Sequence, residues 1–506
     1  MSVGGVFTLI TNKGIQDQML MATDMLKAQI NKMECDKLAT LRNMHPNMTD
    51  SQLRQSDASW MPTLAAIDRS HSLFVNSTYK PFVTTAHEYS KTVPSIGKPS
   101  LGKSFSFVLP LIGDFVNDAV MHITLSGLSA KSNLDKVRYV EMLGHRLTKQ
   151  VRFKVQNQEM DKYTTDTQNA NFQFKVPQQK ETGYLRCIGQ EIPKQGYLTA
   201  DPTVDEVREY RWFGDGPQTF KYQQPDVEMW IPIWFWFKDL QCSLPNFLLP
   251  RNQTEIEITL EAENNLVAFA DYGGGGLYNV PVVSTCELYL NHIFMLPEVT
   301  NIFVQRYGMQ LIRVHRVHNE ELNASSKSVK LHQLKFPLEN LFIGFRPRVN
   351  LLNSQKWFKN TFITNVSVKE AVVTGVASIL VNNAIYFNET HVVSSLGLRA
   401  NDIAIYPYLS PEFYNNYIPF RYGAQYKTPK DLGWYMMNFN FNPGEYQPSG
   451  HFNCSRAREL YLDYVSNTDS GANIIDVGTP ADLIVLADAI NFVVYQDNSM
   501  QLRFST

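Results

Sequence analysis

The chain has 506 residues, of which 44% are hydrophobic and 12% aromatic, and its formal net charge is only −2. A disordered chain needs low hydrophobicity and high net charge, so this composition excludes intrinsic disorder. A dedicated nucleic-acid binder normally carries a basic excess, so we expect no direct, specific contact with nucleic acid. The low charged fraction of 19% is typical either of a large β-rich core or of a surface largely committed to partners.

The N-terminal segment predicts a helix. Between Gly14 and Met33 apolar residues recur at spacings of three and four, which places them on one face. That face consists of Ile15, Met19, Ala22, Leu26, Ile30 and Met33, of which we assign Ile15, Met19, Leu26 and Ile30 to the inner face of the arm. The pattern fits a helix packed on its own domain or an arm that docks on a partner or a membrane surface. A polar stretch follows it, so we expect an N-terminal helical arm over residues 1–60. The first ten residues lack the basic and apolar regions of a secretory signal, so none is expected.

After about residue 70 the apolar residues alternate with a period of two, which predicts strands. In Glu255–Glu261 aliphatic side chains alternate with Glu and Thr, as expected of a strand with one buried face, and Val151–Val155 alternates in the same way. Further strands are predicted at Ser104–Leu109, Trp230–Phe237, Leu311–Val317, Trp434–Phe441, Leu460–Tyr464, Leu483–Leu486, Ile490–Tyr495 and Leu502–Phe504. The uncharged run Ala371–Asn388 is too polar for a membrane span and predicts two strands joined by a turn.

No helical pattern regularly separates these strands, so the sequence favours antiparallel sandwiches over βαβ units. A new set of strands begins after Pro297. We therefore expect two all-β domains of similar size after the arm, one over residues 61–296 and one over residues 297–506.

One motif suggests nucleotide chemistry. Gly97–Ser104 fits the phosphate-loop pattern G-x-x-x-x-G-K-[ST]. Such a loop binds phosphate at a helix N-terminus, but the residues that follow, Phe105–Pro110, are strand-like and end in proline. We therefore expect no nucleotide site here.

Other chemical motifs are weak. His315 and His318 are three residues apart on a predicted strand, so their side chains point to opposite faces and do not form a metal pair. The five cysteines are widely spaced with no CxxC, which favours free, buried thiols over a disulfide framework or zinc site. We expect no catalytic residues, no cofactor and no metal, and hence a structural role rather than an enzyme. A carbohydrate-binding β-sandwich remains an alternative, motivated only by the aromatic content.

Several blocks carry a family resemblance. They are Glu445–Tyr461, Ala489–Phe492, Leu502–Thr506, Gly216–Pro225, Leu311–His315, Phe342–Phe345, Tyr417–Phe420 and Ser100–Gly102. With these blocks the chain resembles the major capsid proteins of large nucleocytoplasmic DNA viruses, most closely the African swine fever virus type. We expect it to differ from that type in length, because it lacks long insertions.

The resemblance implies a double jelly roll, that is, two antiparallel eight-stranded sandwiches side by side behind the N-terminal arm. It further implies a homotrimer that looks pseudo-hexagonal and tiles an icosahedral shell. The implied partners are neighbouring capsomers, minor capsid and penton proteins and an inner viral membrane below the arm. The implied locations are the virion capsid and, during assembly, the viral factory in the host cytoplasm. A poxvirus-type scaffold that shapes immature membranes is the alternative with the same fold.

The most specific block predicts a structural turn that also serves assembly. Its residues are Pro448, Ser449, Gly450, Asn453, Ser455, Arg456 and Arg458. We expect Gly450 to adopt a positive φ, Asn453 and Ser455 to hydrogen-bond the backbone of the turn, and the two arginines to tie it to a neighbouring loop or subunit.

Overall fold

The computed structural model describes residues 25–56, 85–192, 195–200, 208–213, 216–270, 275–297, 300–301, 304, 308–374, 377–422, 425–457, 459–496 and 499–504. These residues fall into two units. One contains the N-terminal region up to Glu88 with residues 112–114 and 292–306, and the other contains the rest of the chain. Both β-sandwiches described below belong almost entirely to the second unit, which is compact.

The N-terminal region contains helices α3 (Met25–Met44) and α4 (Asp50–Ser56). Arg42 on α3 forms an ion pair with Asp50 on α4, and its Nη2 lies 2.7 and 2.6 Å from the two carboxylate oxygens. Helix α3 continues beyond the predicted apolar stripe, which ends at Met33, as far as Met44. Leu26 and Ile30 lie on α3, whereas Ile15 and Met19 lie outside the described residues. No helix among the described residues is long and apolar enough to cross a bilayer.

The first sandwich pairs a five-stranded sheet with a four-stranded one. The five-stranded sheet has the order β1 (Thr85–Thr92), β13 (Val283–Met295), β3 (Phe115–Leu125), β10 (Leu244–Pro245), with β9 (Val227–Pro232) also paired to β3. The other sheet has the order β2 (Ser104–Val108), β11 (Thr254–Leu260), β5 (Thr148–Val155), β6 (Gln158–Thr164). A separate two-stranded sheet pairs β4 (Lys136–Tyr139) with β12 (Val267–Ala270).

The second sandwich has the same plan. Its larger sheet has the order β14 (Met309–Leu322), β26 (Ala481–Gln496), β16 (Pro337–Pro347), β21 (Trp434–Asn438), with β22 (Phe452–Asn453) on β16 and β27 (Ser499–Leu502) on β26. Its smaller sheet has the order β15 (Ser326–Lys330), β23 (Leu460–Ser466), β19 (Val393–Ala400), β20 (Ile403–Leu409). Phe345 and Tyr464 connect the two sheets, with ring centroids 5.5 Å apart.

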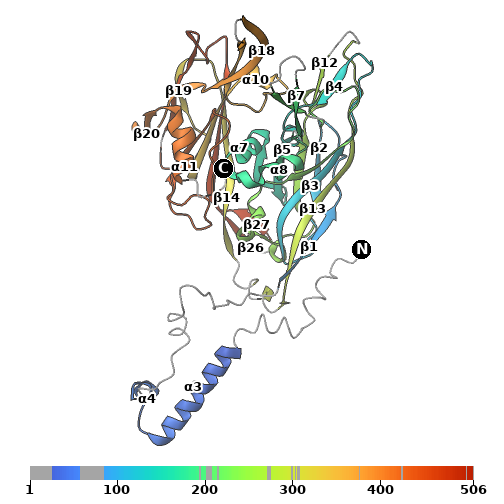
Figure 1. Ribbon diagram of the computed structural model, residues 1–506. Coiled ribbons are helices and arrows are strands. Elements are labelled where there is room, and N and C mark those ends of the chain that lie inside the picture. The colour runs from blue at the N-terminus through green and yellow to red at the C-terminus, as the bar shows by residue number, and fades with distance from the viewer. Residues whose placement is uncertain are drawn as a thin grey trace. The chain divides into compact units, whose positions relative to one another are not determined.

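Hairpins and short helices complete the chain. The hairpins are β7 (Gln195–Ala200) with β8 (Arg208–Phe213), β17 (Phe362–Thr374) with β18 (Ala377–Thr390), and β24 (Thr468–Asp469) with β25 (Ala472–Asn473). The helices are α6 (Leu143–Leu147), α7 (Thr165–Lys175), α8 (Glu181–Cys187), α10 (Arg348–Leu351) and α11 (Ile418–Tyr422). Figure 1 shows the sandwiches side by side with α7 and α8 between them. The fold is therefore the expected all-β double jelly roll.

Most predicted strands are present. In β11, residues Ile256, Ile258 and Leu260 are buried and alternate with half-buried polar residues, as predicted. The strand predicted over Trp230–Phe237 is wrong in its second half. Strand β9 ends at Pro232, which has no N–H to donate to a neighbouring strand. Trp236–Lys238 forms a 3-10 turn instead. The two strands predicted between Leu483 and Tyr495 are one continuous strand, β26. The predicted hairpin in Ala371–Asn388 is formed by β17 and β18.

Candidate functional site

Helix α7 occupies the junction between the two sandwiches. It follows β6 of the first sandwich, and its residues from Thr167 to Phe174 are all buried although most of them are polar. Burying polar side chains is costly unless they have hydrogen-bond partners. The second sandwich supplies several of those partners, so α7 is the element that connects the two halves of the chain.

Four polar contacts run from α7 to the second sandwich. They are Asp166 with Arg346 at 2.6 Å, the side-chain amide of Asn169 with the carbonyl of Phe358 at 2.6 Å, Gln173 with the backbone N–H of Lys430 at 3.0 Å, and Lys175 with Asp488 at 2.7 Å. Burial alone would raise the pKa of Asp488, but the nearby Lys175 ammonium holds it below its ordinary value. Asp488 is therefore ionised at neutral pH and forms a buried ion pair with Lys175.

Aromatic packing reinforces these polar contacts. The ring centroid of Phe174 lies 4.6 Å from that of Phe342 and 6.3 Å from that of Trp434. Both partners lie in the larger sheet of the second sandwich. The carbonyl of Phe174 also accepts a hydrogen bond from the backbone N–H of Lys427 at 2.8 Å. The ring and the backbone carbonyl of Phe174 thus both hold the C-terminal end of α7 against the second sandwich.

Helix α8 adds a second charged contact close by. The carboxylate of Glu181 receives hydrogen bonds from the ammonium groups of both Lys427 and Lys430. Burial acts to raise the pKa of Glu181, but the two ammonium groups outweigh it and lower that pKa. One carboxylate of the first sandwich therefore binds two cations of the second.

A third contact joins β6 to β14. Asp161 is almost fully buried, and its carboxylate accepts a hydrogen bond from the backbone N–H of His315 at 3.0 Å. Its other oxygen lies 2.9 Å from His315 Nδ1. His318 lies on the same strand, but its ring is 5.0 Å from that of His332 instead. The two histidines thus have different neighbours, as predicted.

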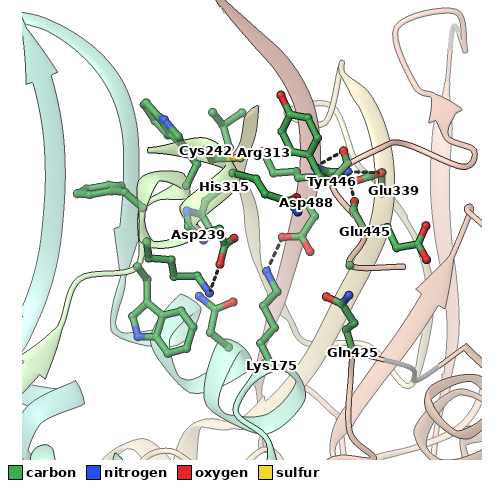
Figure 2. A pocket seen from close by; sticks show the side chains of 18 of the residues that line it. Lys175, Asp239, Cys242, Arg313, His315, Glu339, Gln425, Glu445, Tyr446 and Asp488 are labelled. Carbon is green, nitrogen blue, oxygen red and sulfur yellow. Dashed lines mark hydrogen bonds and ion pairs between the residues drawn. The ribbon is translucent and has the colours of Figure 1, made fainter. Parts of the chain in front are cut away.

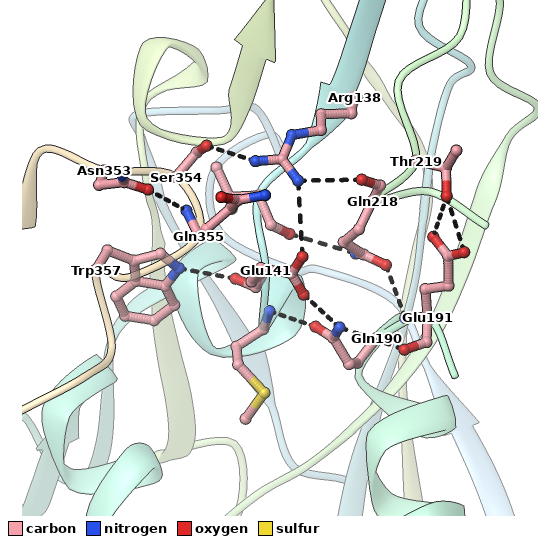
Figure 3. Close-up of polar contacts among 12 residues, drawn as sticks. Arg138, Glu141, Gln190, Glu191, Gln218, Thr219, Asn353, Ser354, Gln355 and Trp357 are labelled. Carbon is pink, nitrogen blue, oxygen red and sulfur yellow. Dashed lines mark hydrogen bonds and ion pairs between the residues drawn. The ribbon is translucent and has the colours of Figure 1, made fainter. Parts of the chain in front are cut away.

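A polar cluster joins the sandwiches near Arg138 (Figure 3). Arg138 donates to Ser354 Oγ at 2.9 Å and to the carbonyl of Gln218 at 3.1 Å. The indole N–H of Trp357 donates to the carbonyl of Glu141 at 2.7 Å. Burial raises the pKa of Glu141, although hydrogen bonding from Gln190 and the charge of Arg138 partly oppose this.

A cavity of about 910 Å³ lies beside α7 and is lined by both sandwiches (Figure 2). Arg313 binds the carboxylate of Glu339 at 2.7 and 3.1 Å and the carbonyls of Glu445 and Tyr446 at 2.7 and 2.9 Å. Cys242 also lines it, but burial raises the pKa of this thiol to about 11, so it is protonated at neutral pH and a poor nucleophile. The charged side chains of the cavity thus bind one another, which suits a structural joint better than a reaction site.

The predicted structural turn lies between β21 and β23. Ser449 Oγ accepts a hydrogen bond from the backbone N–H of Asn442 at 2.7 Å. Asn453 Oδ1 accepts from the N–H and the hydroxyl of Ser455, at 3.0 and 2.6 Å. The expected positive φ at Gly450 is wrong, and it is Gly444, six residues earlier, that has a φ of 87°.

Gly450 has a different reason to be glycine. A Cβ atom there would lie 3.0 Å from the carbonyl oxygen of Phe439 and 3.2 Å from the Cα of Asn440. Pro448 precedes it in the same turn, and the side chain of Arg456 is exposed. Arg458 lies outside the described residues.

The comparisons with known proteins decide the family. A model described as the major capsid protein N-terminus matches residues 72–296, and one described as the large eukaryotic DNA virus major capsid protein matches residues 300–506. The hexon protein p72 of African swine fever virus (isolate Tick/Malawi/Lil 20-1/1983) is 27% identical over an alignment that covers 100% of both chains. This chain belongs to the major capsid proteins of large eukaryotic DNA viruses.

Solved structures agree with this assignment. The Faustovirus major capsid protein is 26% identical, with a TM-score of 0.75, and the match covers 96% of this chain and 100% of that one. The VP54 protein of PBCV-1 is 16% identical, with a TM-score of 0.62 over 86% of this chain and 100% of that one, and supports the fold alone. The alignment with p72 spans 667 positions, more than the 506 residues here, so p72 carries insertions that this capsid protein lacks.

The phosphate-loop pattern and the cysteines can now be placed in the structure. Gly97 and Gly102 of the phosphate-loop pattern lie in turns, and β2 begins at Ser104 where a phosphate-binding loop would need a helix. No cluster of metal-ligating side chains occurs among the described residues. All five cysteines are free, but only Cys242, Cys286 and Cys454 are buried as expected, since Cys35 is exposed and Cys187 is intermediate.

The sequence did not predict α7, which carries most of the junction. A weak signal was present, because Thr164 precedes the helix and Asp166 stands in its first turn, as is typical of a helix start. The polar composition of the helix gave no apolar stripe to extend that signal.

Proposed function

We propose that this capsid protein forms a homotrimeric capsomer that tiles an icosahedral shell and catalyses no reaction. The observation that carries the proposal is the junction around α7, where charged pairs, aromatic packing and backbone hydrogen bonds hold two similar sandwiches side by side. Three copies of such a rigid pair present six sandwiches, which approximates a hexagon and packs into a regular lattice.

Domain boundaries form part of the proposal. We assign residues 1–60 to the arm, 61–296 to the first jelly roll and 297–506 to the second. The two family models support this division, since one ends at residue 296 and the other begins at residue 300.

Partners follow from the capsid role. The trimer contacts neighbouring capsomers and minor capsid and penton proteins, and the arm with Ile15, Met19, Leu26 and Ile30 faces the inner viral membrane. The turn at residues 448–458 stabilises the capsomer, with Arg456 and Arg458 directed at a neighbouring loop or subunit. The protein is assembled in the viral factory and retained in the virion.

Light scattering after size-exclusion chromatography tests the proposal directly. We expect the mass of a trimer, and electron micrographs of the purified protein at high concentration should show hexagonal arrays. A monomer at every concentration tested would contradict the proposal. Absence of the protein from purified mature virions would favour the scaffold role instead.

A further inference from the structure

The cavity beside α7 is lined by buried polar side chains that are not used by the junction. Asn171 on α7 is 1% exposed, and neither the nitrogen nor the oxygen of its side-chain amide has a hydrogen-bond partner among the described residues. Within the same part of the chain, the indole Nε1 of Trp236 and the Oδ1 of Asn117 also have no partner. Buried polar groups without partners destabilise a folded chain, so a group of three at one cavity indicates a ligand.

The cavity has the size of a small-molecule site. Its volume of about 910 Å³ falls in the range of about 300–1,000 Å³ that is typical of such sites. The three groups come from three elements, β3, α7 and the 3-10 turn after β9. Figure 2 shows Lys175 and Asp239 of the first sandwich around the same space as Arg313 and Tyr446 of the second. A ligand in this space therefore contacts both sandwiches.

The charged side chains of the cavity do not select an anion. The lining contains three Lys and Arg side chains against four acids, so it has no positive excess. Each of the three cations already has a carboxylate partner. The pairs are Lys175 with Asp488 at 2.7 Å, Arg313 with Glu339 at 2.7 Å, and Lys238 with Asp239 at 3.5 Å. The fourth acid, Glu445, is exposed.

The unpaired groups indicate a neutral ligand that both donates and accepts hydrogen bonds. A side-chain amide offers two N–H donors and one carbonyl acceptor, and an indole offers one donor. An ammonium ligand has only donors, so the N–H groups of Asn171 and Trp236 would stay unpaired. A carboxylate ligand has only acceptors, so the side-chain oxygens of Asn171 and Asn117 would stay unpaired. A hydroxyl group donates and accepts through one oxygen and matches all of them.

We propose that this cavity binds a neutral sugar, a mono- or disaccharide whose ring hydroxyls pair with Asn171, Trp236 and Asn117. A sugar ring carries hydroxyls that point in several directions, so one molecule reaches groups on three elements. Because the sugar binds the folded chain and contacts both sandwiches, it stabilises the fold by mass action. The inference goes beyond the proposed capsomer and does not depend on it.

Thermal unfolding and titration calorimetry of the full chain test for binding. The probes are glucose, galactose, N-acetylglucosamine, maltose and lactose, with putrescine and phosphate as ionic controls. We expect at least one sugar to bind saturably and to raise the melting temperature, and neither ionic control to do so. A rise that grows with every sugar and never saturates reflects exclusion of the sugars from the protein surface and would count against a site.

Two substitutions and a matched control locate the site. Trp236→Phe keeps the ring and removes the N–H, so it should weaken sugar binding about fivefold. Asn171→Leu should abolish binding, yet its melting temperature without sugar should equal or exceed that of the wild type because an unpaired amide is gone. Asn440→Leu is the control, since Asn440 is also buried with both amide atoms unpaired in the described structure but lies outside the cavity. It should change the melting temperature in the same direction and leave sugar binding intact.

The outcomes separate this inference from the capsomer proposal. Saturable binding of putrescine or phosphate without any sugar, or no saturable binding at all, would overturn the inference. Sugar binding that persists in Asn171→Leu would also overturn it. Should that variant fail to fold, Trp236→Phe decides, and unchanged affinity in it would contradict the assignment. None of these results alters the mass measured by light scattering, which tests the capsomer proposal on its own.

Discussion

Around α7 the chain joins its sandwiches through buried charges, whereas the segment from Tyr408 to Phe420 exposes aromatic side chains to solvent. Lys175 meets Asp488, Arg346 meets Asp166, and Glu181 meets two lysines. By contrast, Phe420 in α11, at the outside of the second sandwich, is 80% exposed. Buried ion pairs demand a specific geometry, and an apolar contact tolerates small shifts. The joint within the chain is therefore built for a fixed orientation, whereas the exposed aromatic side chains impose no such geometry.

The largest expected effect comes from breaking one charged pair of the junction. Lys175→Ala leaves the carboxylate of Asp488 buried without its partner, which should cost about 3 kcal/mol in the free energy of unfolding. Denaturant unfolding measures this cost. The control is Lys327→Ala, whose exposed pair with Glu320 has a similar length of 2.6 Å and should contribute at most about 1 kcal/mol. Equal losses in the two variants would contradict the contrast between junction and surface.

Acid should weaken the first-sandwich side of the junction. His145 is fully buried beside Tyr184, with 2.6 Å between its Nε2 and the hydroxyl, and burial lowers its pKa to about 3. The unfolded chain binds this proton below about pH 6.5, so stability falls as the pH drops below that value. Between pH 7 and pH 5 the loss should be about 2 kcal/mol. Comparing unfolding curves of the wild type and His145→Gln at both pH values measures it, since the variant should lack this loss.

The comparison also shows what local patterns can and cannot predict. The alternation in β11 depends only on which face of one strand is exposed to solvent, so the sequence correctly predicted that Ile256 and Ile258 are buried. The burial of α7 depends on partners such as Arg346 and Asp488, which lie 180 and 313 residues beyond Asp166 and Lys175. No pattern within the helix contains that information.

The closing turn teaches the same lesson on a smaller scale. Asn453 and Ser455 bond each other two residues apart, so their motif contains the whole interaction. The need for glycine at position 450 comes from Phe439 and Asn440, which lie outside the motif. A positive φ was the natural expectation from the turn alone, and the close backbone approach could not be foreseen.

Acid should have the opposite effect on the second-sandwich side of the junction. Burial raises the pKa of Asp431 to about 6, although Lys359 and hydrogen bonds from the N–H groups of Asn360 and Gly433 oppose this. The folded state therefore binds the proton more tightly, and this group's contribution to stability rises as the pH falls from above 6 toward about 4. Between pH 7 and pH 5 the gain should be roughly 1.4 kcal/mol. In Asp431→Asn this gain should disappear, so the variant should lose more stability on acidification than the wild type.

The smallest expected effect distinguishes a crowded glycine from an open one outside the junction. Gly450→Ala brings a Cβ to 3.0 Å from the Phe439 carbonyl oxygen, and the strain should cost about 1 kcal/mol. Gly478→Ala is the matched control, because no heavy atom lies within 4 Å of the added Cβ and the φ is not positive, so this change should be neutral or stabilise by about 0.5 kcal/mol. Relative to the wild type, the melting temperature should fall in Gly450→Ala and should stay the same or rise in Gly478→Ala. The close neighbours of an added Cβ at Gly450 are Phe439 and Asn440, and Gly478 has none, so neither variant should change the pH dependence set by His145 and Asp431. A shift in that dependence with Gly450→Ala would show that the turn and the junction are coupled.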